Sequence, residues 1–261
     1  MNPANTLSYL LSGLAQDVPG IAVSGIAYRS DRVSAGDVFF CVRGFAADGH
    51  DFADDAAKRG AVAVVASREL PGLCVPVVTV RDTREALALA AARFHGDPSR
   101  SLQVVGITGT NGKTTTAYLL DSIARAGGMT TGLIGTVETR IGDRRAVASR
   151  TTPESADLQA MFGEMLTEGV QAVAMEVSSH AIDLGRVHGV HFACAGFTNL
   201  TQDHLDYHKT VEEYGSVKRR LFTDSEVGQR VVCIDDDFGA ALAADIGCEW
   251  TVGTTDGAAV R

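Results

Sequence analysis

The stretch that decides the fold is residues 104–116, Val-Val-Gly-Ile-Thr-Gly-Thr-Asn-Gly-Lys-Thr-Thr-Thr. It joins a hydrophobic strand, a glycine-bearing loop and the start of a helix, the order found in loops that bind nucleotide phosphates. Gly109 and Gly112 leave backbone N–H groups able to wrap an anion. Lys113 can reach the phosphates, and the Thr114 hydroxyl can ligate Mg²⁺ at the positive end of the helix. The stretch therefore predicts a nucleotide phosphate site.

The loop departs from the general P-loop pattern at one glycine. That pattern requires glycine at position 107, where this chain has Ile107, and the glycine here, Gly106, falls one residue early. Either the match is accidental or the loop is a P-loop subtype.

Composition and charge narrow the class of protein. The chain has 261 residues, of which 45% are hydrophobic and 21% charged, as in an ordinary globular protein of one large or two modest domains. A net charge of −9 without a basic stripe argues against a nucleic-acid partner. There is no signal segment and no run of about 18 apolar residues, and the 5 cysteines form no C-x-x-C pair. We therefore expect a cytoplasmic protein with no membrane insertion.

The first part of the chain has the pattern of a small α/β unit. The expected strands are 38–42, 61–66 and 75–80, and the expected helices are 52–59 and 83–94. We expect Thr83 to N-cap the second helix. Gly96-Asp97-Pro98-Ser99-Arg100 then has linker chemistry, which places a domain boundary between residues 97 and 98.

The rest of the chain alternates strand, loop and helix. The expected strands are 102–107, 130–134, 171–177, 193–198, 230–234 and 249–252, and the expected helices are 113–126, 155–168, 212–222 and 238–246. Strands that are apolar on both faces indicate a parallel sheet covered by helices. The predicted fold class is α/β, with a small N-terminal α/β domain, 1–97, followed by a P-loop domain, 98–261, whose mostly parallel sheet is covered by helices.

Polar side chains follow two further expected strands, at the edge where such sheets bind ligands. Glu176 ends an apolar run, where an unpaired carboxylate is costly to bury. A Mg²⁺ held jointly with Thr114 would compensate it; the alternative is a helix N-cap or a structural ion pair, and the phosphate loop favours the metal. His204 follows the next strand, in a segment (199–208) dense in hydrogen-bonding groups, and its place beside the phosphate loop favours a functional role.

Other polar positions have two interpretations each. Lys218 lies in a helix with three successive basic residues, either a solvated basic face or a phosphate clamp. Thr151 and Thr152 precede a helix, where their hydroxyls either bind a second anionic ligand or only cap the helix. Arg186 is either a phosphate or carboxylate contact or a surface charge. A structural interpretation is kept for the remaining histidines considered, His95, His188, His191 and His208.

Together these segments resemble the Mur ligases, the ATP-dependent amide-bond ligases of bacterial cell-wall precursor synthesis, over essentially the whole chain. Residues 109–115 look like the phosphate loop of that family, including its glycine spacing. The segments similar to its diamino-acid-adding branch, the MurE type, are Thr-Thr-Pro-Glu at 151–154, Met-Glu-Val-Ser-Ser-His at 175–180, and 199–208 followed by Tyr214 and Lys218. Gly-Asp-Val-Phe at 36–39 and Asp-Gly-His at 48–50 resemble the uridine-binding domain of that branch.

The resemblance implies a role for each matching residue. ATP would be bound by Gly109, Thr110, Asn111, Gly112, Lys113, Thr114 and Thr115. The catalytic set would be Lys113, Glu176, His204 and Lys218. Thr114 and Glu176 would ligate one Mg²⁺; His204 and Lys218, the latter carbamylated into a metal-binding carboxylate, would ligate a second. The positions that match contacts to the UDP-muramoyl peptide are Ser30, Thr151, Thr152, Ser178 and Arg186.

The implied reaction adds a diamino acid, meso-diaminopimelate or L-lysine, to UDP-N-acetylmuramoyl-L-alanyl-D-glutamate through an acyl phosphate. Residues 1–97 would recognise UDP and 98–261 would bind ATP, in a monomer. Family members have a third, C-terminal domain for the amino acid, so we expect a truncated chain that is weak or inactive alone. The alternatives are a non-catalytic module that binds UDP-muramoyl peptide and ATP, and a regulatory P-loop NTPase.

Two departures from the family pattern fall at expected substrate contacts. Arg29-Ser30-Asp31 stands where the family usually has Asp-Ser-Arg, and Leu184 stands where a glutamine often precedes the matching arginine. We expect them to change the uridine and sugar contacts but not the class of reaction.

Overall fold

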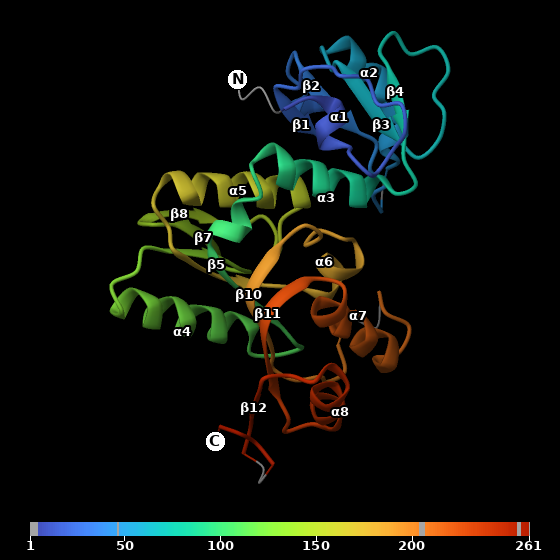
Figure 1. The fold of residues 1–261 in the computed structure, drawn as a ribbon. Helices are drawn as coiled ribbons and strands as arrows, with labels where there is room; N and C mark the ends of the chain where they lie inside the picture. Colours follow the sequence, from blue (N-terminus) through green and yellow to red (C-terminus); the bar gives the residue numbers. More distant parts are fainter. Residues whose placement is uncertain (1–4, 46, 204–206, 255–256, 261) are drawn as a thin grey trace. The chain divides into compact units, whose positions relative to one another are not determined.

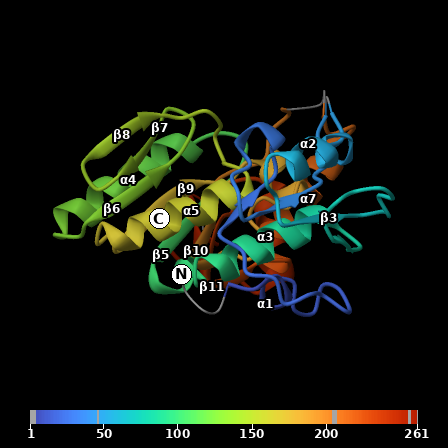
Figure 2. The same cartoon turned by 90° about the horizontal axis from the view of Figure 1, so that it is seen from above.

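The computed structural model describes residues 5–45, 47–203, 207–254 and 257–260 (Figures 1 and 2). The chain divides into two compact units, Met1–Gly96 and Asp97–Arg261. Each unit has its own sheet and its own cluster of buried hydrophobic side chains.

The first unit is built on a parallel sheet with the strand order β1-β2-β3-β4. Its strands are β1 (Gly25–Ala27), β2 (Asp37–Phe40), β3 (Ala63–Ala66) and β4 (Val77–Thr79). Its helices are α1 (Leu7–Leu10), α2 (Ala53–Lys58) and α3 (Thr83–Phe94), with the 3-10 turns η1 (Ser30–Arg32) and η2 (Gly49–Phe52). Strand β3, Ala-Val-Val-Ala, is buried at every position, as expected for a central parallel strand covered on both faces.

The prediction that Thr83 caps α3 is wrong by one residue. The N-cap is Asp82, whose carboxylate accepts hydrogen bonds from the backbone N–H groups of Arg84 at 2.7 Å and Glu85 at 3.2 Å. Thr83 is instead a buried residue of the first turn. A carboxylate satisfies two free N–H groups and also places negative charge at the positive end of the helix, which a hydroxyl does not.

The second unit is built on an eight-stranded sheet with the order β12-β11-β10-β5-β9-β6-β7-β8. Its strands are β5 (Gln103–Thr108), β6 (Thr131–Ile134), β7 (Glu138–Ile141), β8 (Arg144–Val147), β9 (Ala172–Glu176), β10 (His191–Phe197), β11 (Glu226–Cys233) and β12 (Trp250–Val252). Its helices are η3 (Pro98–Ser101), α4 (Lys113–Ala126), α5 (Ser155–Thr167), α6 (Ser179–Asp183), α7 (Val211–Thr223) and α8 (Asp237–Ile246).

This arrangement places the phosphate-loop strand in the middle of the sheet. Strand β5 lies between β10 and β9, and all neighbours from β12 to β6 are parallel. Helices α4 and α5 cover opposite faces (Figure 1). The predicted α/β class, with a mostly parallel sheet covered by helices, is confirmed.

The hairpin β7–β8 is the part of this sheet that was not predicted from the sequence. Both of its pairings, β6 with β7 and β7 with β8, are antiparallel. Strand β8, Arg-Arg-Ala-Val, is exposed at every position, so it has no buried face to produce an alternating apolar pattern. A charged, exposed edge strand of this kind protects the sheet against pairing with another chain.

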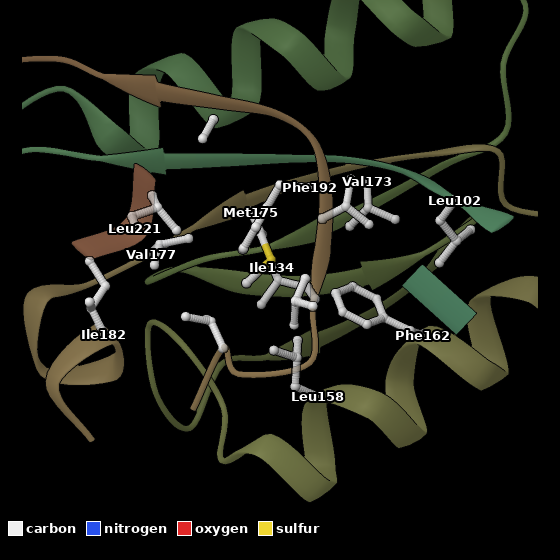
Figure 3. Close-up of a cluster of buried hydrophobic side chains, with 14 of the residues drawn as sticks. Leu102, Ile134, Leu158, Phe162, Val173, Met175, Val177, Ile182, Phe192 and Leu221 are labelled. Atoms are coloured by element: carbon white, nitrogen blue, oxygen red, sulfur yellow. The ribbon is translucent and has the colours of Figure 1, made fainter. Parts of the chain in front are cut away.

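Gly106, the glycine that falls one residue early in the phosphate-loop strand, is needed for packing in the hydrophobic core. The main cluster of buried side chains includes Phe162 from α5 and Phe192 from β10 (Figure 3). A Cβ built on Gly106 would lie 2.6 Å from the Phe192 ring. The next residue, Ile107, points to the other face and packs with Ala117 of α4. The strand therefore needs glycine at 106 and a large apolar residue at 107, which accounts for the shift from the general pattern.

Gly106→Ala is expected to destabilise the second unit by about 1–3 kcal/mol, because the added methyl overpacks against the Phe192 ring. Chemical denaturation measures the change. Combining it with Phe192→Leu, which removes the ring, should recover part of the loss. If Gly106→Ala alone leaves the unfolding midpoint unchanged, the packing explanation is wrong.

Candidate functional site

The phosphate loop connects the end of β5 to the start of α4 at the carboxyl edge of the sheet. Gly109 has φ +141° and Gly112, the residue before the helix, has φ +87°, both in a region that side chains rarely adopt. A Cβ on Gly109 would also lie 1.9 Å from Thr198 Oγ1. Both loop glycines are therefore required by the backbone path.

The loop is held in place by the segment that follows β10. Asn199 makes three contacts: its carbonyl accepts from Thr110 N at 2.8 Å, its Oδ1 accepts from Asn111 N at 3.0 Å, and its Nδ2 donates to Asn111 O at 3.1 Å. Thr198 Oγ1 donates to Asn111 O at 2.7 Å, and Thr201 Oγ1 accepts from Asn111 Nδ2 at 3.1 Å. The sequence indicated only a polar cluster here; its role in bracing the loop was not predicted.

Lys113 lies at the start of α4 with its amine turned onto the loop. Its Nζ donates to Gly109 O at 2.9 Å and to Thr110 O at 2.8 Å. Burial lowers the pKa of Lys113, and the negative charges of Glu176 and Asp203 partly oppose that shift. The amine is thus placed at the loop that would hold phosphates.

Glu176 ends β9 beside the loop and is only 1% exposed. Its Oε2 accepts hydrogen bonds from Thr114 Oγ1 at 2.9 Å and from Thr136 Oγ1 at 3.0 Å, and its Oε1 accepts from Thr136 N at 2.8 Å. The carboxylate is neither a helix N-cap, since Ser178 caps α6, nor part of an ion pair among the described residues. Two hydroxyl groups and one backbone N–H compensate its burial, and Thr136 was not among the predicted site residues.

The oxygen pair formed by Thr114 and Glu176 suits a hard cation. Mg²⁺ is usually held by one or two protein oxygens and completes its shell with water and phosphate oxygens. The described residues contain no group of three or more His, Cys, Asp or Glu side chains able to hold a metal ion. A site with few protein ligands beside a phosphate loop fits Mg²⁺ bound together with a nucleotide.

Lys218 does not lie on a solvated face. It is 1% exposed on α7, its Nζ donates to Gly109 O at 2.8 Å, and the amine lies 4.1 Å from the Tyr214 ring centroid. Burial, helped by the positive charge of Lys113, lowers the pKa of Lys218 to about 7. Lys218 therefore faces the phosphate loop. This position fits a phosphate clamp and not a solvated basic face.

The other basic residues of α7 are the solvated ones. Arg219 pairs with Asp245 at 2.6 Å, and Arg220 pairs with Asp183 at 3.0 Å. The predicted ligand His204 lies outside the described residues. His208, for which a structural role was kept, is buried, with Nε2 3.0 Å from Ser179 Oγ.

Thr151, Thr152, Ser178 and Arg186 lie next to Glu176, and we call this group the cradle. Thr152 Oγ1 donates to Glu176 O at 2.9 Å and accepts from Ser178 N at 3.1 Å. Arg186 is 9% exposed, so it is no ordinary surface charge; its Nη1 donates to Thr152 O at 3.2 Å and its Nε lies 2.6 Å from Glu154 Oε1. Arg186 thus forms a buried ion pair with Glu154, the last residue of the Thr-Thr-Pro-Glu stretch, which was not among the predicted site residues.

Ser30, the remaining predicted substrate contact, belongs to the first unit. It is the first residue of η1, and its side chain hydrogen-bonds Asp55, which is the main reason that the pKa of Asp55 is lowered. The charged neighbours that depart from the family pattern, Arg29 and Asp31, pair with each other at 2.7 Å. The Arg29 guanidinium and the Asp31 carboxylate thus form an ion pair with each other at the protein surface.

None of the helices in the described part of the chain has the length and apolar character needed to cross a membrane.

Known proteins resemble this chain in sequence over both units. The Mur ligase middle domain matches residues 107–261, and the Mur ligase family catalytic domain matches residues 22–95. The UDP-N-acetylmuramoyl-L-alanyl-D-glutamate–2,6-diaminopimelate ligase of Bacillus velezensis is 45% identical over 248 residues, which cover 92% of this chain and 50% of that protein. The ligase of the same name from Geobacillus kaustophilus is 55% identical over 201 residues, covering 77% of this chain and 40% of the relative. The chain spans about half the length of the curated relatives it matches.

Solved structures share the fold. One, a UDP-N-acetylmuramoyl-L-alanyl-D-glutamate–2,6-diaminopimelate ligase, has a TM-score of 0.83 at 24% identity and covers 97% of this chain and 53% of its own. MurF ligase from Thermotoga maritima, solved in complex with ADP, has a TM-score of 0.57 at 24% identity and covers 88% of this chain and 49% of its own. Taken with the sequence matches, these similarities show that the chain belongs to the Mur ligase family.

Proposed function

We propose that this chain provides the ATP-binding and UDP-muramoyl-dipeptide-binding parts of a ligase that extends UDP-N-acetylmuramoyl-L-alanyl-D-glutamate by a diamino acid. The observation that carries the proposal is the position of Glu176. Its carboxylate accepts from Thr114 beside the phosphate loop, while its backbone carbonyl accepts from Thr152 of the cradle. A nucleotide and a second anionic ligand would therefore meet at one residue.

The proposed reaction has two steps. A carboxylate oxygen of the D-glutamyl residue attacks the γ-phosphorus of ATP, the bond to the β-phosphate oxygen breaks, and ADP leaves. The amine of the diamino acid then attacks the carbonyl carbon of the acyl phosphate, loses a proton and displaces phosphate. Lys113, held at the loop, would stabilise charge on the transferring phosphoryl group.

Thr114 and Glu176 are the residues that would hold Mg²⁺. When bound, the ion neutralises negative charge on the β- and γ-phosphates. The support is chemical: a hydroxyl and a carboxylate oxygen lie 2.9 Å apart at the start of α4, beside the loop.

Lys218 is the residue that would carry a carbamate. The ammonium would first lose a proton. The neutral nitrogen would then attack the carbon of CO₂, forming an N–C bond as one C–O π bond breaks, and would release a second proton, so that a cation becomes a carboxylate. A buried amine that donates to Gly109 O and rests on the Tyr214 ring is suited to this change, because burial disfavours its charged form. The carbamate and His204 would then hold a second ion near the phosphates.

The substrate assignments follow the family. Residues 1–97, with Ser30, would recognise the UDP group, and the cradle of Thr151, Thr152, Ser178 and Arg186 would bind the muramoyl peptide. The names of the relatives favour 2,6-diaminopimelate over lysine as the diamino acid.

Calorimetric titration tests the proposal directly. We expect UDP-N-acetylmuramoyl-L-alanyl-D-glutamate to bind, and Arg186→Gln to weaken that binding without changing the affinity for ADP. The non-catalytic module predicts binding of both ligands with no release of ADP when ATP and diaminopimelate are added. An unrelated P-loop NTPase predicts nucleotide binding with no affinity for the UDP-linked peptide, which would overturn the proposal.

A further inference from the structure

A residue outside the predicted site makes more contacts with the Glu176 carboxylate than any predicted residue does. Thr136, in the turn between β6 and β7, bonds both carboxylate oxygens, one through its backbone N–H at 2.8 Å and the other through its hydroxyl at 3.0 Å. Thr136 is itself exposed, whereas Glu176 is 1% exposed. An exposed side chain therefore covers a buried acid at the point where ligands would approach.

The turn is shaped for this contact. A Cβ built on Gly135 would lie 2.4 Å from Glu176 Oε1 and 3.5 Å from its Cγ. A side chain at 135 would displace the carboxylate oxygen that accepts from the following N–H, so glycine there favours the observed contact. The bond between Thr136 and Glu176 is thus a built feature of the turn and not a chance orientation of one hydroxyl.

Counting protons gives the direction of the hydrogen bonds. An ionised carboxylate only accepts, so both Thr114 and Thr136 donate their hydroxyl protons to Glu176 Oε2. The Thr136 hydroxyl has no second proton, so in its 3.1 Å contact with Thr151 Oγ1 the donor is Thr151. One hydroxyl chain therefore runs from the cradle, through Thr136, to the carboxylate beside the phosphate loop.

We infer that Thr136 is a positioning residue, which fixes the rotamer of Glu176 so that one oxygen faces Thr114 and the incoming Mg²⁺, and which links that carboxylate to Thr151 in the cradle. The inference rests on the proposed function, because it assigns Thr136 a task in the same site. A carboxylate that lost this contact would turn more freely and present its oxygen to the ion for less of the time.

The test is the Mg²⁺ dependence of ADP binding, measured by calorimetry on the chain at a series of Mg²⁺ concentrations and in EDTA. Thr136→Val removes the hydroxyl but keeps the shape and the backbone N–H. The Mg²⁺ concentration for half-maximal ADP binding should rise about tenfold, the size expected for losing a hydrogen bond to a charged group. ADP affinity in EDTA should not change, because the loop contacts are untouched.

Two variants separate positioning from a merely structural role. Thr136→Ser keeps the hydroxyl and should restore the wild-type Mg²⁺ midpoint. Gly135→Ala would push Glu176 Oε1 away and should raise the midpoint even though Thr136 is intact. Thr139→Val, the same change on β7 where the side chain has no hydrogen bond to Glu176 among the described residues, is the control and should leave the midpoint unchanged.

The outcomes are distinguishable. Thr136→Val with the wild-type Mg²⁺ midpoint overturns the role of Thr136 and leaves the proposed function standing. Equal weakening with and without Mg²⁺ shows a structural role and also overturns the inference. A wild-type chain that binds ADP without any response to Mg²⁺ overturns the metal site, and with it the proposed function.

Discussion

In a ligase that also carries the C-terminal domain of the family, Lys218→Met is expected to lower activity by about 10²–10³-fold, the loss typical of removing one group that stabilises charge in the transition state. The methionine side chain cannot form a carbamate, so the proposed second metal site would lose its carboxylate. Release of ADP in the presence of the UDP-linked dipeptide and diaminopimelate measures the activity. A ¹³C-bicarbonate NMR experiment should show a carbamate signal in the wild type that is absent from the variant.

The same variant is expected to be more stable than the wild type at and below neutral pH in CO₂-free buffer. Folding lowers the pKa of Lys218 to about 7 from 10.5, so folding disfavours the charged amine. Between those values the unfolded chain binds more protons, and wild-type stability rises with pH. Methionine has no charge to bury, so the variant avoids this loss of stability. Its gain in stability over the wild type should be largest below about pH 7 and should fall towards zero as the pH approaches 10.5.

Measurements of activity and of stability together test the role of Lys218. Wild-type activity in Lys218→Met would refute the carbamate, and a variant less stable than the wild type at pH 6 would show that the bond to Gly109 O outweighs the buried charge. Arg219→Met, a basic residue one position along that pairs with Asp245 at the surface, is the matched control and should change neither property greatly.

Asp121→Ala is expected to destabilise the second unit by about 3–5 kcal/mol, the range for removing one member of a buried ion pair. Asp121 on α4 is 5% exposed; it pairs closely with Arg140 of β7, also 5% exposed, and accepts from Thr131 Oγ1 at 2.6 Å. In the variant the Arg140 guanidinium would stay buried. Its charge would then be balanced only by the more distant Glu138 carboxylate, 3.7 Å away. Urea denaturation measures the loss.

The double variant Asp121→Leu/Arg140→Met is the control. It removes both charges together and fills the space with apolar groups, so its stability should lie near that of the wild type. Burial raises the pKa of Asp121, but the hydrogen bonds from Arg140 and Thr131 outweigh it and lower the pKa overall. The ion pair should therefore contribute fully above the unfolded pKa of about 4 and be lost as the pH falls through the lower folded pKa. A single variant as stable as the double one would refute the buried-pair argument.

Several elements could be predicted because their signals are local. The start of α4 at Lys113 followed from the glycines before it, and the central strands followed from apolar runs bounded by turns. The β7–β8 hairpin could not be predicted, because its exposed strand carries no apolar pattern. The cap of α3 was placed one residue late, since Asp82 and Thr83 are both good caps and only the backbone geometry distinguishes them.

The chemistry of the site divides in the same way. The sequence alone determined the phosphate loop, because its glycines, lysine and threonine are contiguous and act through backbone geometry and one helix start. Only the tertiary structure decided that Asn199 braces the loop, that Thr136 holds Glu176, and that Lys218 is buried against Gly109, 109 positions away. The physical reason is that burial and hydrogen-bond partnership depend on which strand ends meet at the edge of the sheet. The order of the strands in the sheet decides which strand ends lie together, and no short stretch of sequence specifies that order.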